Sequence, residues 1–145
     1  MILQLTPNTH PILHERVKPC SKDLDRPQIS RILKENMIHY EGVGLSANQI
    51  GICERVFIMV LNMETEETIT CFKPRIIKRY DDNVWCEEGC LSFPDEIINI
   101  QRPNRIVVKY EDEDKKDHKI KLDGLAARVF LHEFDHLEGI VFTER

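Results

Sequence analysis

The sequence predicts an α+β fold in which antiparallel sheets surround a central helix that contains a His-Glu-x-x-His motif. Three observations support this prediction. Apolar residues recur at helical spacing over residues 124–138, which include the motif. Short segments rich in β-branched residues occupy the middle of the chain. The connections between these segments are short, which favours antiparallel pairing because parallel crossovers need a dozen or more residues.

The composition is that of a globular domain. The chain has 145 residues, of which 41% are hydrophobic, and we expect residues 1–145 to form a single domain with its own core. The net charge of −5 argues against direct nucleic-acid binding. No apolar segment is long enough to cross a bilayer and the N-terminus lacks a signal-peptide pattern, so we expect no membrane association. The odd number of cysteines, five, favours a soluble protein in a reducing compartment.

The elements expected before the motif are one helix and a series of strands. Residues 1–24 show little periodicity and are expected to form an extended arm. A helix is predicted from Pro27 to Glu41, with Asp25 as its N-cap and Gly42 as its stop. Strands are predicted at residues 55–61, 68–73, 76–80, 97–101, 106–111 and 119–122, with a loop at 86–94.

The His-Glu-x-x-His motif predicts a catalytic metal centre. On a helix, His132 and His136 project from one face, close enough to share an ion, and Glu133 lies beside that face. A metal held by imidazoles lets water ionise near neutral pH, and a neighbouring carboxylate can take and return the proton. The alternative is a pair of surface histidines on a helix, but chance rarely produces this spacing in such a composition.

Two histidines seldom complete a metal site, so a third ligand is expected. Downstream of the motif the only carboxylates are Glu138 and Glu144. A cysteine from the loop at 86–94 is a better candidate because a thiolate is a strong, soft ligand. Two histidines and one cysteine would leave one tetrahedral position open for water.

That loop also allows a competing interpretation. Cys86 and Cys90 combine with His132 and His136 as C-x3-C and H-x3-H, within the spacing range of a closed structural zinc site. Such a site would have no free coordination position and no chemistry. Glu133 argues against it, because a structural site has no need of a carboxylate beside its first histidine.

A glycine-containing segment follows the first predicted helix. Residues 42–47 match the dinucleotide-binding fingerprint in letters, but that motif follows a strand and opens a helix, whereas this segment follows a helix and precedes a strand. We therefore reject that interpretation. What remains is a loop that lets the backbone approach a ligand closely, followed by Gln49, whose amide can donate a hydrogen bond. From this segment alone, a helix C-cap with a surface glutamine is the favoured alternative.

Three segments, in order along the chain, resemble the three motifs of the peptide deformylases. They are Gly-Val-Gly-Leu-Ser-Ala-Asn-Gln at 42–49, Glu-Gly-Cys-Leu-Ser at 88–92 and His-Glu-Phe-Asp-His-Leu-Glu-Gly at 132–139. The resemblance covers nearly the whole chain. It implies a peptide-deformylase-like catalytic domain, a metal-dependent hydrolase that removes the N-formyl group from the formylmethionine of nascent polypeptides and releases formate.

The resemblance also implies a role for individual residues. Cys90, His132 and His136 would bind one divalent metal, Fe²⁺ in cells and Zn²⁺, Ni²⁺ or Co²⁺ in preparations. Glu133 would act first as the general base and then as the acid. The remaining implied residues are the oxyanion donors Gln49 (side-chain amide) and Leu91 (backbone N–H), the cleft residues Val43, Gly44 and Gly89, and Leu125 and Val129 facing the methionine pocket.

The resemblance further implies the partner and the setting. The expected partners are N-formylmethionyl peptides. We expect the protein to be a monomer in the cytoplasm of a bacterium or of a phage-infected host. Ser46 stands where the family commonly has alanine, and Leu131 where it commonly has glutamine. Few residues follow Gly139, so we expect a short form that resembles phage or organelle versions without the long C-terminal helix. A zincin-like endopeptidase, which would cleave unformylated peptides internally, is a further alternative.

Overall fold

The computed structural model describes residues 1–145 and has the predicted α+β architecture. The helices are α1 (Arg26–His39) and α2 (Gly124–Leu137), and neither is long and apolar enough to cross a bilayer. The strands are β1 (Gly44–Ser46), β2 (Val56–Asn62), β3 (Glu67–Arg79), β4 (Asn83–Cys90), β5 (Phe93–Pro103), β6 (Arg105–Glu111) and β7 (Asp117–Asp123). Three short 3-10 helices are η1 (Pro11–His14), η2 (Ala47–Ile50) and η3 (Phe142–Glu144).

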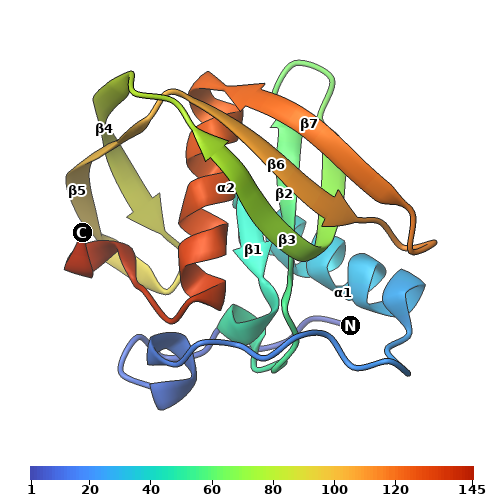
Figure 1. The fold of residues 1–145 in the computed structure, drawn as a ribbon. Coiled ribbons are helices and arrows are strands. Elements are labelled where there is room, and N and C mark those ends of the chain that lie inside the picture. The colour runs from blue at the N-terminus through green and yellow to red at the C-terminus, as the bar shows by residue number, and fades with distance from the viewer.

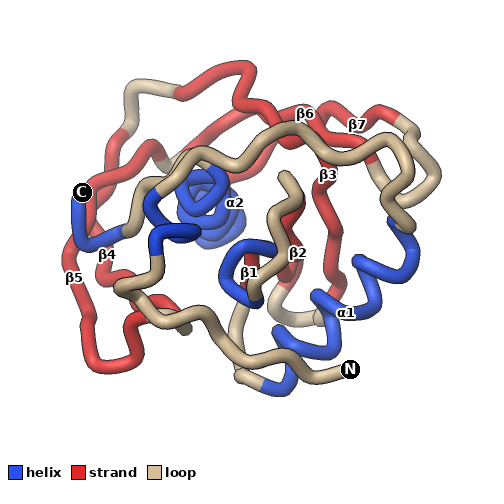
Figure 2. The backbone as a smooth tube through the Cα atoms, turned by 90° about the horizontal axis from the view of Figure 1, so that it is seen from below, coloured by secondary structure: helices blue, strands red, loops and turns tan.

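The strands form two antiparallel sheets with α2 between them. One sheet has five strands in the order β1-β2-β3-β6-β7, and the other is the β4–β5 hairpin. Figure 1 shows α2 between the hairpin and the larger sheet. Viewed nearly along its axis in Figure 2, α2 is enclosed by the hairpin on one side and by β1 and β2 on the other. The prediction of antiparallel sheets around a central motif helix is confirmed.

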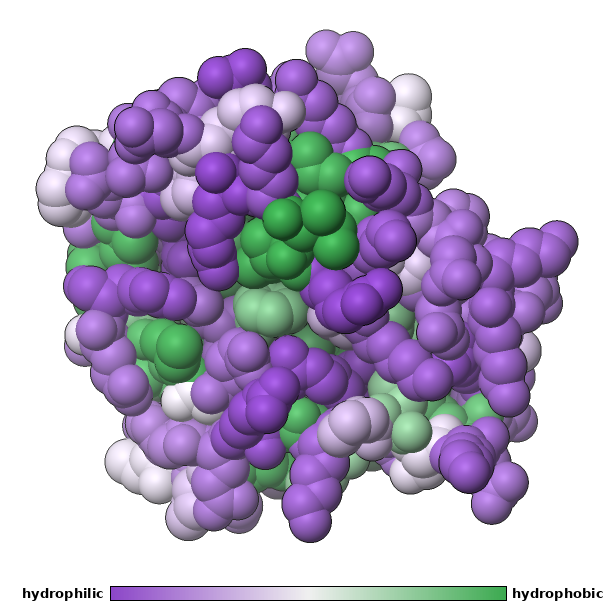
Figure 3. All heavy atoms as spheres, viewed as in Figure 1, coloured by the Kyte–Doolittle hydropathy of each residue, from purple (hydrophilic) through white to green (hydrophobic).

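Strand β2 is buried on both faces because a helix covers each side of the larger sheet. Phe57 and Met59 belong to the core on the α2 side, whereas Val56 and Ile58 belong to the core on the α1 side. Successive side chains of a strand point to opposite faces, so this continuous apolar run supplies both cores. The face shown in Figure 3 is mostly hydrophilic, with a group of apolar residues near its middle.

The two helices begin and end close to the predicted positions. The side chain of Asp25 caps α1 by accepting a hydrogen bond from the backbone N–H of Gln28 at 3.1 Å. Helix α2 ends before Gly139, whose φ of 75° is left-handed. A Cβ at Gly139 would lie 2.6 Å from the carbonyl carbon of Glu15, so only glycine lets the N-terminal arm pass this close to the end of α2.

Two predictions about the strands are wrong. The expected loop at 86–94 is part of a hairpin in which Cys86 pairs with Ile100 and Glu88 with Ile98. Glu87 and Glu88 break the apolar alternation that predicts a strand. Glu88 is nevertheless buried, because ion pairs with Arg102 and Arg128 compensate the burial of its charge. The two strands expected at 68–73 and 76–80 are one strand, β3, whose register shifts on either side of residues 75–76 let it continue past a proline.

A core substitution tests this packing. Phe57 is fully buried, and its ring meets that of Phe130 edge to face with centroids 5.0 Å apart. We expect Phe57→Ala to lower the free energy of unfolding by about 3 to 5 kcal/mol, because it leaves a cavity between α2 and the sheet. Urea denaturation measures the change. Ile38→Ala on α1, where the side chain is 62% exposed, should change stability by less than about 0.5 kcal/mol; similar losses in both variants would contradict the assignment.

Candidate active site

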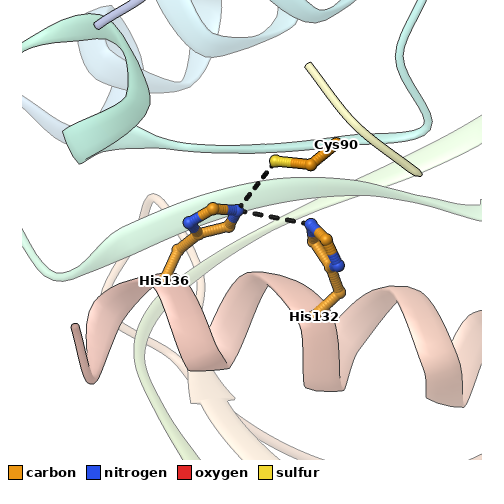
Figure 4. A group of neighbouring side chains, drawn as sticks. All are labelled: Cys90, His132 and His136. Carbon is orange, nitrogen blue, oxygen red and sulfur yellow. Dashed lines mark hydrogen bonds between the residues drawn. The ribbon is translucent and has the colours of Figure 1, made fainter. Parts of the chain in front are cut away.

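Three potential metal ligands converge between the hairpin and α2. The ligand atoms of Cys90, His132 and His136 all lie within 4.8 Å of one another. Nε2 of His136 is 3.3 Å from Sγ of Cys90 and 3.3 Å from Nε2 of His132, and the three side chains point toward one another in Figure 4. A tetrahedral ion with bonds of about 2.0–2.3 Å needs ligand separations of about 3.3–3.6 Å. The two separations that involve His136 therefore match those of a metal site, and the three residues together could hold one ion with a fourth position open.

The side chain of Glu88 orients the first of these histidines. Its Oε1 atom accepts a hydrogen bond from Nδ1 of His132 at 3.0 Å, which leaves Nε2 of His132 facing the other two ligands. Glu88 also accepts hydrogen bonds from Arg102 and Arg128. Burial alone would raise the pKa of Glu88, but the hydrogen bonds from His132 and Arg102 outweigh burial and lower it to about 2. The carboxylate therefore stays ionised.

The two imidazoles differ in their protonation. Burial lowers the pKa of His136 well below its usual value, so this ring is neutral and ready to bind a cation. Burial also disfavours the charged form of His132, but hydrogen bonding to Cys90 and Glu88 outweighs it and raises the pKa of His132 to about 10 in the metal-free protein. Metal binding must therefore displace a proton from this site.

The carboxyl group of Glu133 is buried without a partner for one of its oxygens. Its side chain lines the cleft, and Oε1 makes no hydrogen bond. Burial raises the pKa of Glu133 to about 7, so the group can both accept and release a proton near neutral pH. A Cβ at Gly44 would lie 2.6 Å from Oε2 of Glu133. Gly44 therefore makes room for this carboxyl.

The amide of Gln49 is held with its N–H groups toward the ligands. Its Oε1 accepts hydrogen bonds from the backbone N–H and the hydroxyl of Ser46, both at 3.0 Å. Nε2 then lies 3.1 Å from Oγ of Ser92 and 3.5 Å from Sγ of Cys90. Gln49 is 1% exposed, so the alternative of a surface glutamine is wrong.

A cleft of about 470 Å³ opens onto these groups. Every predicted site residue except His136 contributes to its wall, and His136 is 1% exposed. Those residues are Val43, Gly44, Gln49, Gly89, Cys90, Leu91, Leu125, Val129, His132 and Glu133. Sequence reasoning missed Arg128 in the wall, although it lies four residues before His132 and therefore on the same side of α2.

The closed zinc site considered from the sequence is not formed. The side chain of Cys86 is exposed, and its thiol contacts the backbone oxygen of Glu87 at 3.7 Å. Only Cys90 from this hairpin joins the two histidines. Cys86 and Cys90 are separated because β4 is a strand, whereas the four-ligand site assumed a loop that could bring both thiols inward.

Residues 2–145 match the family model of the polypeptide deformylases. The chain belongs to the polypeptide deformylase family. The peptide deformylase of Thermotoga maritima (strain MSB8) is 40% identical over 136 residues, which cover 93% of this chain and 81% of that protein.

Solved structures of the family agree with the fold. A crystal structure of the Thermotoga maritima peptide deformylase has a TM-score of 0.93 and 36% identity, covering 100% of this chain and 97% of that one. A class I type b peptide deformylase from Acinetobacter baumannii, bound to Met-Ala-Ser, has a TM-score of 0.92 and 29% identity, covering 100% and 98%. Peptide deformylases are metal-dependent hydrolases that remove the N-formyl group from nascent chains, and the activity expected from the sequence motifs is confirmed.

The burial of Glu133 predicts a pH dependence of stability. The pKa rises from 4.5 to about 7 on folding, so the folded metal-free protein binds this proton more tightly than the unfolded chain does. The free energy of unfolding should therefore fall as the pH rises through this interval. In Glu133→Gln the fall should be shallower by up to about 1.4 kcal/mol per pH unit. Urea unfolding of the metal-free proteins measures this, with Glu64→Gln in an exposed turn as the control; equal slopes in parent and Glu133→Gln would refute the assignment.

Proposed function

We propose that this chain deformylates N-formylmethionyl peptides with Cys90, His132 and His136 as its metal ligands and Glu133 as its proton-transfer group. The observation that supports this most directly is the placement of a buried carboxyl, one of whose oxygens has no hydrogen-bond partner, beside three converging metal-ligand atoms at a cleft. A site of this kind serves metal-assisted amide hydrolysis, and the bond to a formyl group is an amide.

The proposed ligand set suits several divalent metals. Thiolate and imidazole bind iron, zinc, nickel and cobalt, and availability often decides among them. When bound, such a metal supplies Lewis-acid activation, which allows water to ionise near pH 7. We assign Fe²⁺ as the metal in cells from the resemblance of the motifs, with Zn²⁺, Ni²⁺ or Co²⁺ in preparations. Anaerobic purification followed by elemental analysis tests this assignment.

Glu133 is the proposed base and then the acid. Its carboxylate takes a proton from the attacking water and later passes that proton to the nitrogen of the departing amine. Formate and a free α-amine result. In the metal-free protein, burial raises the pKa of Glu133 to about 7, so this carboxyl binds a proton more readily than an exposed one does, as a group that takes and returns a proton requires.

Gln49 and Leu91 are the proposed donors to the oxyanion. The bonds from Ser46 to Oε1 direct the Gln49 N–H groups toward Cys90 and Ser92. Leu91 follows Cys90 in the turn between β4 and β5, where its backbone N–H can serve the same oxygen. Donors held in place before the reaction stabilise the negative charge without reorganising.

The proposed substrate lies in the cleft as an extended peptide. β1 and β4 each pair on only one edge, and both contribute residues to the cleft, so a peptide can add as a strand along Val43, Gly44 and Gly89. Leu125 and Val129 provide an apolar wall for the methionine side chain. The Met-Ala-Ser tripeptide bound by the Acinetobacter baumannii relative supports a peptide ligand.

We propose that residues 1–145 act as one catalytic domain, monomeric, in the cytoplasm of a bacterium or of a phage-infected host, without direct nucleic-acid binding. The ligands, the base and the cleft walls all come from one chain, so the site needs no second copy. Sedimentation analysis of the active protein tests the oligomeric state.

The base is tested by formate release from a formyl-Met peptide under anaerobic conditions. Glu133→Ala should bind as much metal as the parent but release formate at least about 100-fold more slowly, because proton transfer is lost. Cys86→Ser is the matched control, and it should retain activity because its exposed thiol lies outside the metal cluster. Full activity in Glu133→Ala would refute the base, and an inactive metal-loaded parent would refute the function.

The oxyanion donor is tested by Gln49→Glu, which keeps the acceptor for Ser46 but replaces the donating N–H group. We expect kcat to fall by about 100- to 1000-fold with little change in KM, since the donor acts in the transition state. Gln28→Glu on the exposed face of α1 is the control. A kcat for Gln49→Glu close to that of the parent would exclude this role.

A further inference from the structure

We propose that Arg145 is a positioning residue for the metal site, acting on His132 through a series of buried ion pairs. The inference rests on the proposed function, in which His132 is a metal ligand. Arg145 lies ten residues beyond Asp135 and touches no ligand itself. Its effect must therefore pass through the charged groups between them.

The contacts form a continuous path. Arg145 donates from Nη2 to Oδ1 of Asp135 at 2.5 Å and from Nε to Oδ2 at 3.0 Å. Oδ2 of Asp135 also accepts from Nη1 of Arg102 at 2.8 Å. Arg102 donates from Nε and Nη2 to the two oxygens of Glu88, at 2.5 and 3.0 Å. Glu88 in turn accepts from Nδ1 of His132 at 3.0 Å.

Burial makes each member of this path depend on its neighbours. The side chains of Arg102, Glu88 and Asp135 are only 4%, 5% and 6% exposed. A charge buried to this extent is costly unless it is paired, and removing one partner leaves the other uncompensated. Arg145 is 39% exposed and is the end of the path nearest to solvent, so it can be changed with the least disturbance of the core.

The number of partners explains why the loss of Arg145 would be felt at His132. Glu88 has cationic partners in Arg102 and Arg128, and Asp135 has them in Arg102 and Arg145. Without Arg145, Arg102 is the only cation hydrogen-bonded to Asp135. Arg102 lies between two buried carboxylates, and its position balances its attraction to each of them. Once Asp135 has lost its other cation, a shift of Arg102 toward Asp135 is favoured, and this shift lengthens the bonds from Arg102 to Glu88. Glu88 then loses part of the support that fixes the His132 ring.

A purely structural role for Arg145 is the alternative. In that case the ion pair to Asp135 only fastens the segment after α2, and its loss lowers stability without altering the folded site. The two roles differ in what happens to a bound metal well below the unfolding transition. Only a positioning role changes the coordination and the retention of the ion in the folded protein.

The test uses Co²⁺ as the probe metal in the parent, Arg145→Gln and Arg145→Lys. Lysine keeps the charge but cannot reproduce the two-bond contact with Asp135. Arg16→Gln is the matched control, because Arg16 pairs with Glu138 at the same end of α2 at 2.9 Å and takes no part in the path. The measurements are the visible absorption spectrum of bound Co²⁺ and the rate of its loss to a chelator, with circular dichroism to establish that each protein is folded.

We expect Arg145→Gln to lose Co²⁺ about 10- to 100-fold faster than the parent and to show an altered spectrum, as when outer partners of a metal ligand are removed. Arg145→Lys should lie between the two, and Arg16→Gln should match the parent. Parent-like Co²⁺ retention in either folded Arg145 variant, or equally fast loss in Arg16→Gln, would overturn the inference. If Arg145→Gln does not fold, Arg145→Lys decides alone. A parent that binds no Co²⁺ would instead refute the metal site of the proposed function.

Discussion

The buried carboxylate of Glu88 is the group on which the arrangement of this protein depends. It sits on β4 and bonds to His132 and Arg128 of α2 and to Arg102 of β5, so one side chain joins the hairpin to the central helix. Burying an ion is unfavourable unless every lone pair finds a donor, which limits the orientations that the hairpin can take against α2. The position of Cys90, two residues beyond Glu88, follows from the same restriction.

Near Glu133 the interior is organised in the opposite way. Whereas Glu88 is surrounded by donors and stays ionised, Glu133 is buried with one of its own oxygens unpartnered, and burial raises its pKa to about 7. Two neighbouring glutamates thus differ in proton affinity: Glu88 is firmly ionised, and Glu133 has a pKa close to neutral pH. Neighbouring groups, and not the residue type, set this difference.

The sequence predicted the parts of the site that depend on local geometry. A helix repeats every 3.6 residues whatever surrounds it, so His132, Glu133 and His136 could be placed on α2 from spacing alone. The pairing of β4 with β5 could not be foreseen, because Glu87 and Glu88 break the apolar alternation expected of a strand. Arg102 and Arg145 were missed for a related reason. A lone arginine usually lies at the surface, and neither the burial of Arg102 nor the pairing of Arg145 with Asp135 can be seen until the fold brings distant carboxylates to them.

The proposed metal ligands come from two separate elements, a hairpin and a helix. Cys90 is the last residue of β4, at the turn of a hairpin that pairs with no other strand, and the histidines lie on a helix that begins more than thirty residues later. An ion bound by all three acts as a cross-link across that interval, in a protein without disulfides between these elements. Metal loading and the docking of the hairpin on α2 would then be thermodynamically coupled, so that each stabilises the other.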